Sequence, residues 1–493
     1  MYELKNVYAI CSIAALGGAL IGFDISSMSG ILGVQAYWEY FGHPNPLAEG
    51  AVTAMMPVGS LVGSLLSWHL AWNMSPKWAL QYACCLWIFG CTLQAAVPAV
   101  SVLYTGRLLA GMGAGIISAV VPVYQAEIAP LHIRGRVISF QQWAITWGIL
   151  IQYFIQYAAV RLFDGRAGVL NPQVFALRLS FGVQIVPGVL LFAALFFFPQ
   201  SPRYLAARDL WHTAMQLLAD LHGGGDVRHD HVLAEYMEIE EDLRAQRRNG
   251  KITFKMLFRK PLRRRIALGM SVQAWSQLCG MNIMMYYVVY IVVGAGLTSP
   301  LLIASMQYLI NVVFTVPAIL FVDKWGRRPT LLVGSLYYGQ PNTEETRSHI
   351  NAQLSWIIEE NRPAAVGIVF FSCLFVAAFA ATWGPISWIY PAEMFPSGIR
   401  SRAVALCTAT NWFCNVLVAF SVPRLLNCLA LIYTFAAVYE TKGYALEEMD
   451  DVFASGMPAW KTPPKESRLG QITAEHDLGW PSWWRHFALI ASA

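Results

Sequence analysis

The sequence VYQAEIAPLHIRG at 123–135 recurs in related form as IYPAEMFPSGIRS at 389–401. Both copies read Tyr-x-Ala-Glu with an arginine seven residues after the glutamate, and the two glutamates lie 266 residues apart. Each copy stands at the end of an apolar stretch. Because many membrane folds are built from internal repeats, the pattern predicts two homologous halves.

The composition places these halves in a membrane. The chain has 493 residues, of which 56% are hydrophobic and 13% charged, whereas a soluble protein is about 45–50% apolar and about 25% charged. This excludes a soluble multidomain enzyme and a disordered chain, and the net charge of +5 is too small for a nucleic-acid partner. A span needs about 20 apolar residues, so the length fits about ten to twelve spans in a lipid bilayer. The nine cysteines lie in apolar stretches without paired-ligand spacing, which is typical of small buried side chains.

Apolar segments occur in two groups of six, separated by a polar region at about 199–262. None shows the alternation of a β-barrel, so we predict an all-α membrane protein of two six-helix bundles. The segments are 7–31, 52–72, 78–98, 101–123, 137–160, 176–198, 266–294, 300–322, 329–339, 364–390, 403–421 and 428–439. The predicted parts are an N-terminal bundle (1–198), a central loop with short helices (199–262), a C-terminal bundle (263–442) and a tail (443–493).

The distribution of lysine and arginine predicts the orientation. No lysine or arginine occurs between Lys5 and Lys77, whereas nine occur from Arg247 to Arg265 at the end of the central loop. Cytoplasmic loops carry the excess of basic residues, so this loop and both termini are expected on the cytoplasmic side. The first apolar run is too long for a cleaved signal peptide, and we expect it to remain in the protein.

The second half distributes its residues unevenly. From Arg134 to Gln200 there are 66 residues, enough for two spans, but from Arg400 to Glu440 there are only 40. The ninth segment, 329–339, would form about 16 Å of helix. We therefore expect spans 9, 11 and 12 to be shortened.

Two charges fall inside the predicted membrane region. Asp24 lies within the first apolar segment, and Arg107 opens the fourth. A charge at mid-bilayer costs at least about 2.5–3.5 kcal/mol on insertion scales, so it needs a partner or a function. We expect an ion pair whose protonation at the aspartate frees the arginine and couples a proton to bundle movement; the alternative is a permanent structural ion pair.

Polar side chains also recur at helical spacing along the apolar segments. Amides donate and accept hydrogen bonds like sugar hydroxyls, and aromatic faces suit the C–H face of a sugar ring, so the set predicts a polar ligand in an apolar cavity. Each amide alone also fits a bond between helices. Gly280 is expected to break its helix. The candidates are Gln142, Gln277, Asn282, Tyr286, Asn311, Asn411 and Trp412.

Acidic and basic residues gather at the predicted inner ends of the segments. Such pairs are expected to hold the two bundles together when the inner gate is closed, although helix-end pairing is equally consistent with them. They are Glu127, Arg134, Arg203, Asp323, Arg327, Arg328, Glu393, Arg400 and Glu440.

Taken together, the motifs resemble the sugar-porter branch of the major facilitator superfamily, particularly its fungal proton-coupled hexose permeases. They occur in family order over about residues 10–455. They are GRLLAGMGAGIISAVVPVYQAEIAPLHIRG, PQSPRYL, QLCGMN with the following YY, DKWGRR, WGPISWIYPAEMFPSGIRSR, NWFCN and ETKGYALEEMD.

The resemblance implies twelve helices, alternating access and a central sugar site that also includes Trp388. Asp24 matches the acidic position of proton-coupled members, with Arg107 as its partner, which favours hexose:proton symport by a monomer in the plasma membrane. Expected partners are a sugar, a proton and the bilayer, with no cofactor, metal or nucleic acid. No metal-ligand spacing, nucleotide loop or nucleophile–base pair indicates an enzyme. A carrier of a polyol, quinate or a disaccharide, and a transport-dead or receptor-like homologue, remain alternatives.

Several positions depart from the family pattern. The loop after the second segment reads WNMSPKW, with Ser75, Pro76 and Lys77 in place of Gly-Arg-Arg. Gln200 replaces a glutamate, and Ser276 replaces the first of two paired glutamines. These changes reduce the expectation of transport more than that of common ancestry.

Overall fold

The computed structural model describes residues 4–32, 46–96, 99–130, 133–163, 178–249, 262–282, 285, 300–338 and 362–437. Within these ranges every regular element is a helix, in agreement with the predicted all-α fold. The chain divides into two compact units, Met1–Pro423 and Arg424–Ala493. The described part of the second unit is the end of a single helix, and the contacts below lie within the first unit.

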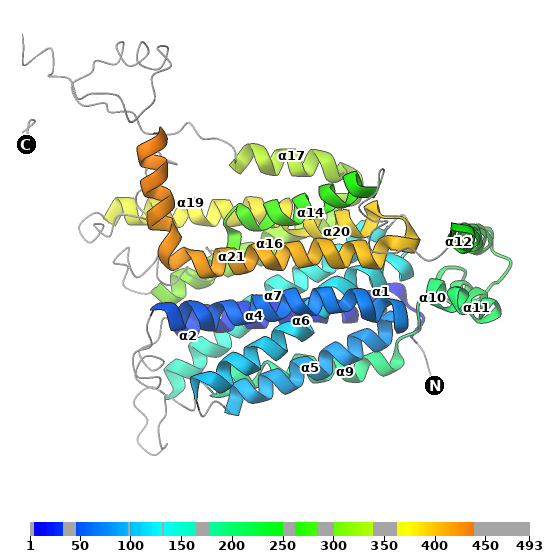
Figure 1. Cartoon of the computed structure of the whole chain (residues 1–493), viewed down its shortest axis with the longest axis horizontal. Coiled ribbons are helices and arrows are strands. Elements are labelled where there is room, and N and C mark those ends of the chain that lie inside the picture. The colour runs from blue at the N-terminus through cyan, green and yellow to red at the C-terminus, as the bar shows by residue number, and fades with distance from the viewer. Residues whose placement is uncertain are drawn as a thin grey trace, which may run out of the picture. The chain divides into compact units, whose positions relative to one another are not determined.

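The elements, labelled in Figure 1, are α1 (Val7–Ala14), α2 (Leu16–Leu32), α4 (Pro46–Asn73), α5 (Pro76–Ala96), α6 (Val100–Ile128), α7 (Arg134–Phe163), α9 (Ile185–Ala194), the 3₁₀ turn η2 (Leu195–Phe197), α10 (Pro202–Ala207), α11 (Trp211–His222), α12 (Asp230–Asn249), α14 (Leu262–Leu278), α16 (Pro300–Trp325), α17 (Arg327–Tyr338), α19 (Arg362–Ala381), α20 (Trp383–Met394) and α21 (Ser397–Ala437).

Seven helical stretches within the described ranges are long and apolar enough to cross a membrane. They are Val7–Ser27, Ala51–Leu70, Pro76–Ala96, Val100–Ile128, Arg178–Phe197, Ala304–Trp325 and Val369–Met394. Helix α7 is less apolar because it carries buried glutamines at positions 141, 142, 152 and 156. With 30 residues it extends about 45 Å, which also suffices for a bilayer.

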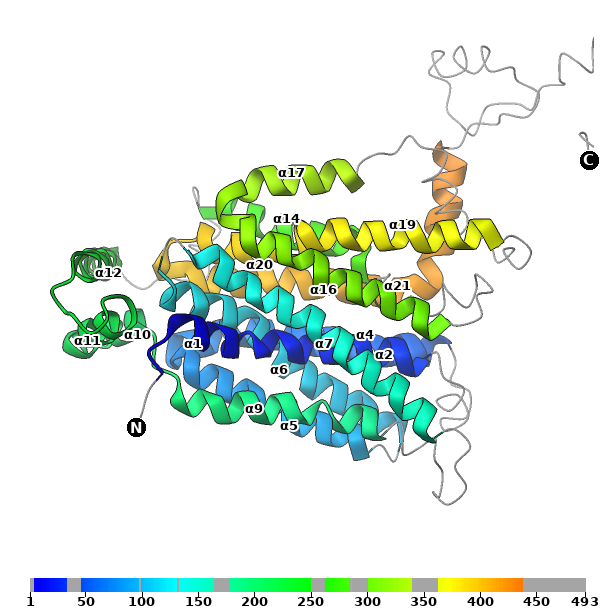
Figure 2. The same cartoon turned by 180° about the vertical axis from the view of Figure 1, so that it is seen from behind.

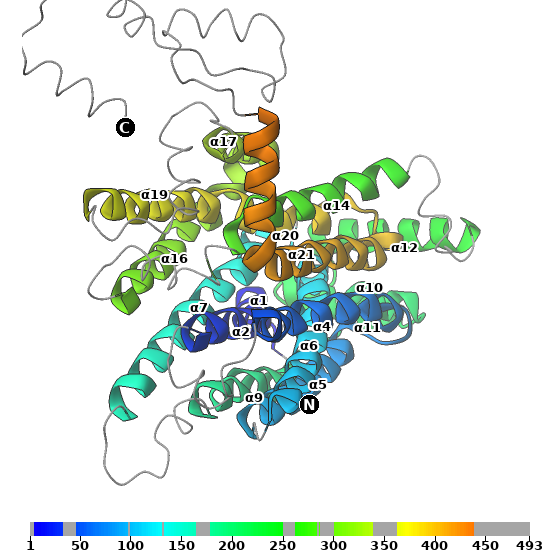
Figure 3. The same cartoon turned by 60° about the vertical axis from the view of Figure 1, so that its left-hand side comes forward.

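In the first half, helix α6 packs against both α4 and α5, while α2 packs along α7 (Figure 3). The contact between α4 and α6 requires small residues. A Cβ atom at Gly111 or Gly115 would overlap the backbone of Met56 or Ser60, and Ser60 Oγ donates a hydrogen bond to the Gly111 carbonyl at 3.0 Å. Small residues that allow such close approach are characteristic of helix pairs in membranes.

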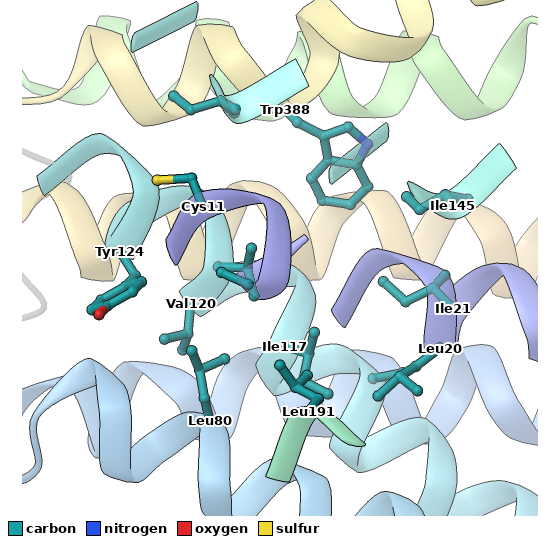
Figure 4. Packing of buried hydrophobic residues seen from close by; sticks show 14 of the residues in the cluster. Cys11, Leu20, Ile21, Leu80, Ile117, Val120, Tyr124, Ile145, Leu191 and Trp388 are labelled. Carbon is teal, nitrogen blue, oxygen red and sulfur yellow. The ribbon is translucent and has the colours of Figure 1, made fainter. Parts of the chain in front are cut away.

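The two halves meet where α7 and α6 contact α16 and α20 (Figure 2). Tyr153 of α7 and Tyr308 of α16 make an edge-to-face contact with ring centroids 4.8 Å apart. Figure 4 shows that Trp388 of α20 reaches the same buried cluster as Ile21 of α2 and Ile145 of α7. Residues from both halves therefore form one continuous core.

Helices α10, α11 and α12 fall within the predicted central loop and lie at one end of the membrane helices (Figure 1). They have a core of their own, in which Leu205, Leu218, Val232 and Ile239 are buried. The loop is therefore a small helical assembly within the ranges that the structure describes.

Some boundaries in the second half differ from the prediction. The segment expected at 364–390 is interrupted at Thr382, whose φ of −130° and ψ of −86° leave the helical region. The segments 403–421 and 428–439 are expected as two shortened spans, whereas their described residues belong to one helix, α21, which has 41 residues. The ninth segment is helical where it is described, as α17 covers Arg327–Tyr338; the residues that follow, 339–361, lie outside the described ranges, so its shortening stays a prediction.

Candidate functional site

Asp24 of α2 and Arg107 of α6 form a bidentate ion pair inside the first half. Arg107 Nη1 and Nη2 donate to Asp24 Oδ1 at 3.2 Å and Oδ2 at 2.9 Å, and each side chain is only 1% exposed. Arg107 Nε also donates to the Val52 carbonyl of α4 at 2.8 Å. Charge-assisted bidentate bonds are strong, and removal of one buried partner typically costs about 3–5 kcal/mol. The predicted ion pair is confirmed, while its coupling to a proton stays a prediction.

Four amide side chains of the second half form one hydrogen-bonded series, here called the amide chain. Asn282 Nδ2 donates to Gln277 Oε1, and Gln277 Nε2 donates to Asn411 Oδ1 at 3.2 Å. Asn411 Nδ2 then donates to Gln273 Oε1 at 2.6 Å. Gln273 Nε2 ends the series on the Ser387 carbonyl of α20 at 2.8 Å. The structure thus brings three predicted residues, Gln277, Asn282 and Asn411, together.

A helix break explains why Gln277 and Asn282 meet. Side chains five residues apart in a continuous helix would point about 140° apart. Helix α14 instead ends at Leu278, and Gly280 adopts a φ of 90° in the left-handed region, which glycine enters without strain. The break predicted at Gly280 is therefore confirmed.

Two tryptophans of the predicted site connect the halves by hydrogen bonds. Trp388 Nε1 donates to Gln142 Oε1 of α7 at 3.0 Å, and both residues are 8% exposed. Trp412 Nε1 of α21 donates to Ser118 Oγ of α6 at 3.0 Å. Because Trp388 follows Ser387, the Gln142 contact adjoins the end of the amide chain.

The remaining predicted ligands are not part of this network. Asn311 of α16 is 2% exposed, and its Nδ2 lies 3.9 Å from Met285 Sδ. Its Oδ1 has no hydrogen-bond partner among the residues that the structure describes. Tyr286 lies outside the described residues. The roles of all eight predicted ligands stay predictions.

At the predicted inner end of the second half, Arg327 joins two carboxylates. Its Nε and Nη2 donate to Glu393 Oε2 at 2.9 Å and Oε1 at 2.7 Å, and Nη2 also donates to Asp323 Oδ1 at 3.0 Å. Asp323 Oδ2 accepts the backbone N–H of Arg136 in α7 at 3.1 Å. A Cβ atom on Gly135 would overlap both Arg327 Nη2 and Asp323 Oδ1. The charge cluster of the second half therefore packs directly against the start of α7.

The corresponding end of the first half is organised differently. Glu127 Oε2 accepts the hydroxyl of Ser201 at 2.5 Å. Arg203 pairs with Asp242 of α12 at 3.3 Å and lies 3.8 Å from Glu238.

Two arginines predicted for this gate keep unbonded nitrogen atoms. Arg400 is 7% exposed, and its Nε donates to the carbonyl of Phe395, which lies between α20 and α21. Arg400 Nη1 and Arg134 Nε are buried without a hydrogen-bond partner within the described ranges. Arg328 is exposed, and Glu440 lies outside the described residues. Among the described residues of the predicted gate, the contact between the halves is therefore the hydrogen bond from the Arg136 backbone to Asp323, while the charge pairs of Arg327 lie within the second half.

The sequence missed two residues that organise the site. Gln273 is 1% exposed and stands one helical turn before Gln277, so its spacing carried a usable signal. His222 Nδ1 lies 2.7 Å from Glu235 Oε2, and its Nε2 lies 2.8 Å from the Ile128 carbonyl at the end of α6. These partners are 13 and 94 residues away in sequence, so no local pattern indicated them.

These features define a membrane transporter of the major facilitator fold: membrane-length helices in two halves, a buried intramembrane ion pair, and amide side chains where the halves meet. The chain belongs to the sugar (and other) transporter family, whose pattern matches residues 10–453. The members of this family are transporters rather than enzymes.

The chain is similar in sequence to several relatives over nearly its whole length. It is 48% identical to the MFS glucose transporter mfs1 of Aspergillus flavus, covering 96% of this chain and 95% of that protein. It is 37% identical to the high-affinity glucose transporter of Kluyveromyces lactis, covering 93% and 87%. Among solved structures, the proton:xylose symporter XylE bound to 6-bromo-6-deoxy-D-glucose matches with a TM-score of 0.73 at 26% identity, covering 90% of this chain and 98% of that one.

Proposed function

We propose that this protein carries a hexose together with a proton across the plasma membrane by alternating access, as a monomer. The glucose transporters among its relatives support a hexose as substrate, and the similarity to a proton:xylose symporter supports the proton. The single observation that carries symport is the buried ion pair between Asp24 and Arg107.

In this mechanism the sugar binds between the N-terminal bundle (1–198) and the C-terminal bundle (263–442). The central loop (199–262), the tail (443–493) and both termini lie on the cytoplasmic side. The ligands are Gln142, Gln277, Asn282, Tyr286, Asn311, Trp388, Asn411 and Trp412. Protonation neutralises Asp24 and releases Arg107, which frees α2 and α6 to move. Opening of the inner gate breaks the contact of Asp323 with α7. Sugar and proton shift this equilibrium only by their different affinities for the two states.

The test uses purified protein in proteoliposomes. With an inward proton gradient, labelled glucose should accumulate, and an uncoupler should abolish the accumulation. The variant Asp24→Asn should lose accumulation but retain exchange of labelled for unlabelled glucose, because exchange needs the sugar site and not the proton. Asp24→Glu keeps a carboxylate and serves as the control. Uncoupler-resistant accumulation by Asp24→Asn would exclude symport through this pair.

A second candidate is a transport-dead or receptor-like homologue. The loop after α4 favours it, because Ser75, Pro76 and Lys77 stand in place of the Gly-Arg-Arg of the family pattern. Correctly inserted protein that neither accumulates nor exchanges any hexose, polyol, quinate or disaccharide would support this candidate over transport.

A further inference from the structure

Four buried glutamines of the first half keep polar atoms without a hydrogen bond. Gln94 of α5 leaves both Nε2 and Oε1 unbonded, Gln184 leaves Nε2, and Gln152 and Gln156 of α7 leave their Oε1 atoms, as far as the described residues reach. None of the four is more than 4% exposed. Burying polar atoms in this way is costly unless a ligand bonds them.

Two of the glutamines connect α7 to the helix that carries Asp24 and to the segment before α9. Gln156 Nε2 donates to the Ser27 carbonyl of α2 at 2.8 Å, and Ser27 Oγ donates to the Asp24 carbonyl at 2.7 Å. Gln152 lies one turn earlier on the same face of α7, and its Nε2 donates to the Ser180 carbonyl at 2.8 Å. The two α7 glutamines thus join α2 to the segment that leads into α9.

The other two glutamines lie against α5 and α6. The Gln184 carbonyl accepts the Trp87 indole N–H of α5 at 3.0 Å, and Gln184 Oε1 lies 4.0 Å from Cys91 Sγ. Gln94 follows Cys91 by one turn and packs against α6, since a Cβ atom on Gly106 would lie 2.9 Å from Gln94 Cγ. The contacts therefore continue from the start of α9 through α5 to α6.

These contacts close a ring around the ion pair. Gly106 directly precedes Arg107, and Arg107 binds Asp24 of α2, where the series of contacts began. Asp24 lies near the end of the span Val7–Ser27, and α2 ends away from α10–α12 (Figure 1). The four glutamines therefore lie within the first half, toward the predicted outer side, whereas the amide chain belongs to the second half.

Water fits the unbonded atoms better than another ligand. The four glutamines leave three oxygens and two nitrogens unbonded in the described part of the chain, so the ligand must both donate and accept hydrogen bonds. A buried water does both and typically makes about three hydrogen bonds. Each Asp24 oxygen accepts one bond from Arg107 and has a second lone pair for a water. The pair neutralises its own charges, so the site offers no net charge for an ion.

We propose that the four glutamines hold a cluster of waters that carries the proton between the outer solution and Asp24. A proton enters at the outer end and passes along the hydrogen-bonded waters. The last water, as hydronium, gives one proton to an Asp24 oxygen, so the carboxylate becomes a neutral carboxyl group and the hydronium becomes water again. The proton thus has a route inside the first half, separate from the sugar route between the halves. This inference rests on the proposed function, since it assumes that Asp24 takes up the transported proton.

The first test detects the waters without any transport. Brief X-ray irradiation of the purified protein makes hydroxyl radicals from water in place, and these oxidise nearby sulfur atoms. Cys91 is 0% exposed but lies beside Gln184, so it should be oxidised severalfold faster than Cys407. Cys407 is the matched control, because it is also 0% exposed and packs within an apolar cluster. Gln94→Met should slow the oxidation of Cys91 and leave that of Cys407 unchanged.

The second test asks whether the waters carry the proton. In proteoliposomes with an inward proton gradient, Gln94→Met should accumulate labelled glucose severalfold more slowly than the unmodified protein. Exchange of labelled for unlabelled glucose should keep its rate, because exchange proceeds with Asp24 protonated throughout. The matched control is Gln81→Met, which should keep both rates. Gln81 is a 4% exposed glutamine of α5 that also lacks a hydrogen bond within the described ranges, but it stands 13 residues before Gln94, about 20 Å along the helix.

Each outcome has a separate meaning. Equal oxidation of Cys91 and Cys407 overturns the water cluster. Fast oxidation of Cys91 together with undiminished accumulation by Gln94→Met overturns the proton route, since the waters then do not carry the proton. A parallel loss of accumulation and exchange in Gln94→Met marks damage to the fold, and the comparison of the two cysteines then decides alone. Absence of proton-driven accumulation by the unmodified protein overturns the proposed function itself, and the proton route with it.

Discussion

The two copies of the repeated motif place the same glutamate at the predicted inner end of each half, yet the two glutamates have different partners. Glu393 receives both arms of a bidentate bond from Arg327, and Asp323 shares the same guanidinium. Glu127 accepts a serine hydroxyl, that of Ser201. A repeated motif therefore does not guarantee repeated electrostatics.

The difference originates in the loops that face the motifs. After α16 the sequence DKWGRR supplies Asp323 and Arg327. After α4 the sequence WNMSPKW supplies Lys77, which donates to the carbonyls of Phe196 and Phe198 at the end of η2. The lysine thus stabilises the end of a span, and the first half relies on α11 and α12 for its charge contacts.

The pKa values of the buried arginines differ between the two halves in the same way. Burial lowers the pKa of Arg134 below its ordinary value, and the neighbouring Arg203 acts in the same direction. Burial also acts to lower the pKa of Arg327, but its bonds to Glu393 and Asp323 outweigh this and raise the pKa above its ordinary value. The charges at the inner end of the second half neutralise one another, whereas positive charges lie close together at the inner end of the first half.

The largest expected effect comes from the same substitution at both copies of the motif. Glu393→Gln breaks the bidentate pair with Arg327, whose side chains are 22% and 25% exposed, and should destabilise the protein by about 1–3 kcal/mol. Glu127→Gln should cost less than about 1 kcal/mol, because an amide oxygen can still accept from Ser201. The thermal unfolding midpoints of the purified variants, measured at one scan rate, should fall in that order. Equal decreases would refute the asymmetry.

An effect of similar size is expected where the charge cluster of the second half contacts the start of α7. Gly135→Ala places a Cβ atom against Arg327 and Asp323, an overpacking of about 1–3 kcal/mol that α7 and α16 relieve by separating. Spin labels on cysteines replacing the exposed Met74 and Trp325 should report a longer distance between the halves. Gly182→Ala is the control, because its Cβ would meet only Ala95 Cβ at 3.8 Å. An unchanged distance distribution in Gly135→Ala would show that this contact does not hold the gate.

Much of this arrangement could be predicted from the sequence, since membrane helices leave strong compositional signals. The Asp24–Arg107 pair was predictable because a charge among apolar residues needs a partner. The break at Gly280 was predictable because glycine interrupts a helix between two polar residues. The amide chain was partly predictable, as Gln277, Asn282 and Asn411 stand out in apolar segments.

Other features depend on three-dimensional contacts that sequence spacing does not contain. The pairing of Arg203 with Asp242, rather than across the gate, depends on how α12 folds back. The continuity of α21 depends on which weak helix-ending signal prevails between 421 and 428. Gln273 was overlooked because a single buried amide most often makes a hydrogen bond between helices. Only the hydrogen bond that its Oε1 accepts from Asn411 shows that it belongs to the amide chain.

The smallest expected effect is a pH dependence confined to the contact of the central loop with the first half. Burial alone would lower the pKa of His222, but the hydrogen bond and charge of Glu235, with the Ile128 carbonyl, raise it above its ordinary value of 6.5, although the nearby Arg134 opposes this. A raised pKa means that the stabilisation is complete below pH 6.5 and is lost as the pH rises through the folded-state value. The docking of α11 against α6 should therefore loosen as the pH rises.

The loosening of α11 can be measured by hydrogen exchange of α11 and α12, once the rates are corrected for the intrinsic pH dependence of amide exchange. Protection should decrease severalfold from acidic to alkaline pH in the unmodified protein and become independent of pH in His222→Gln. Protection around Arg327 should not change over the same range, because a guanidinium remains charged throughout. If His222→Gln kept the pH dependence, another group would control the docking, and the first half would not differ from the second in this respect.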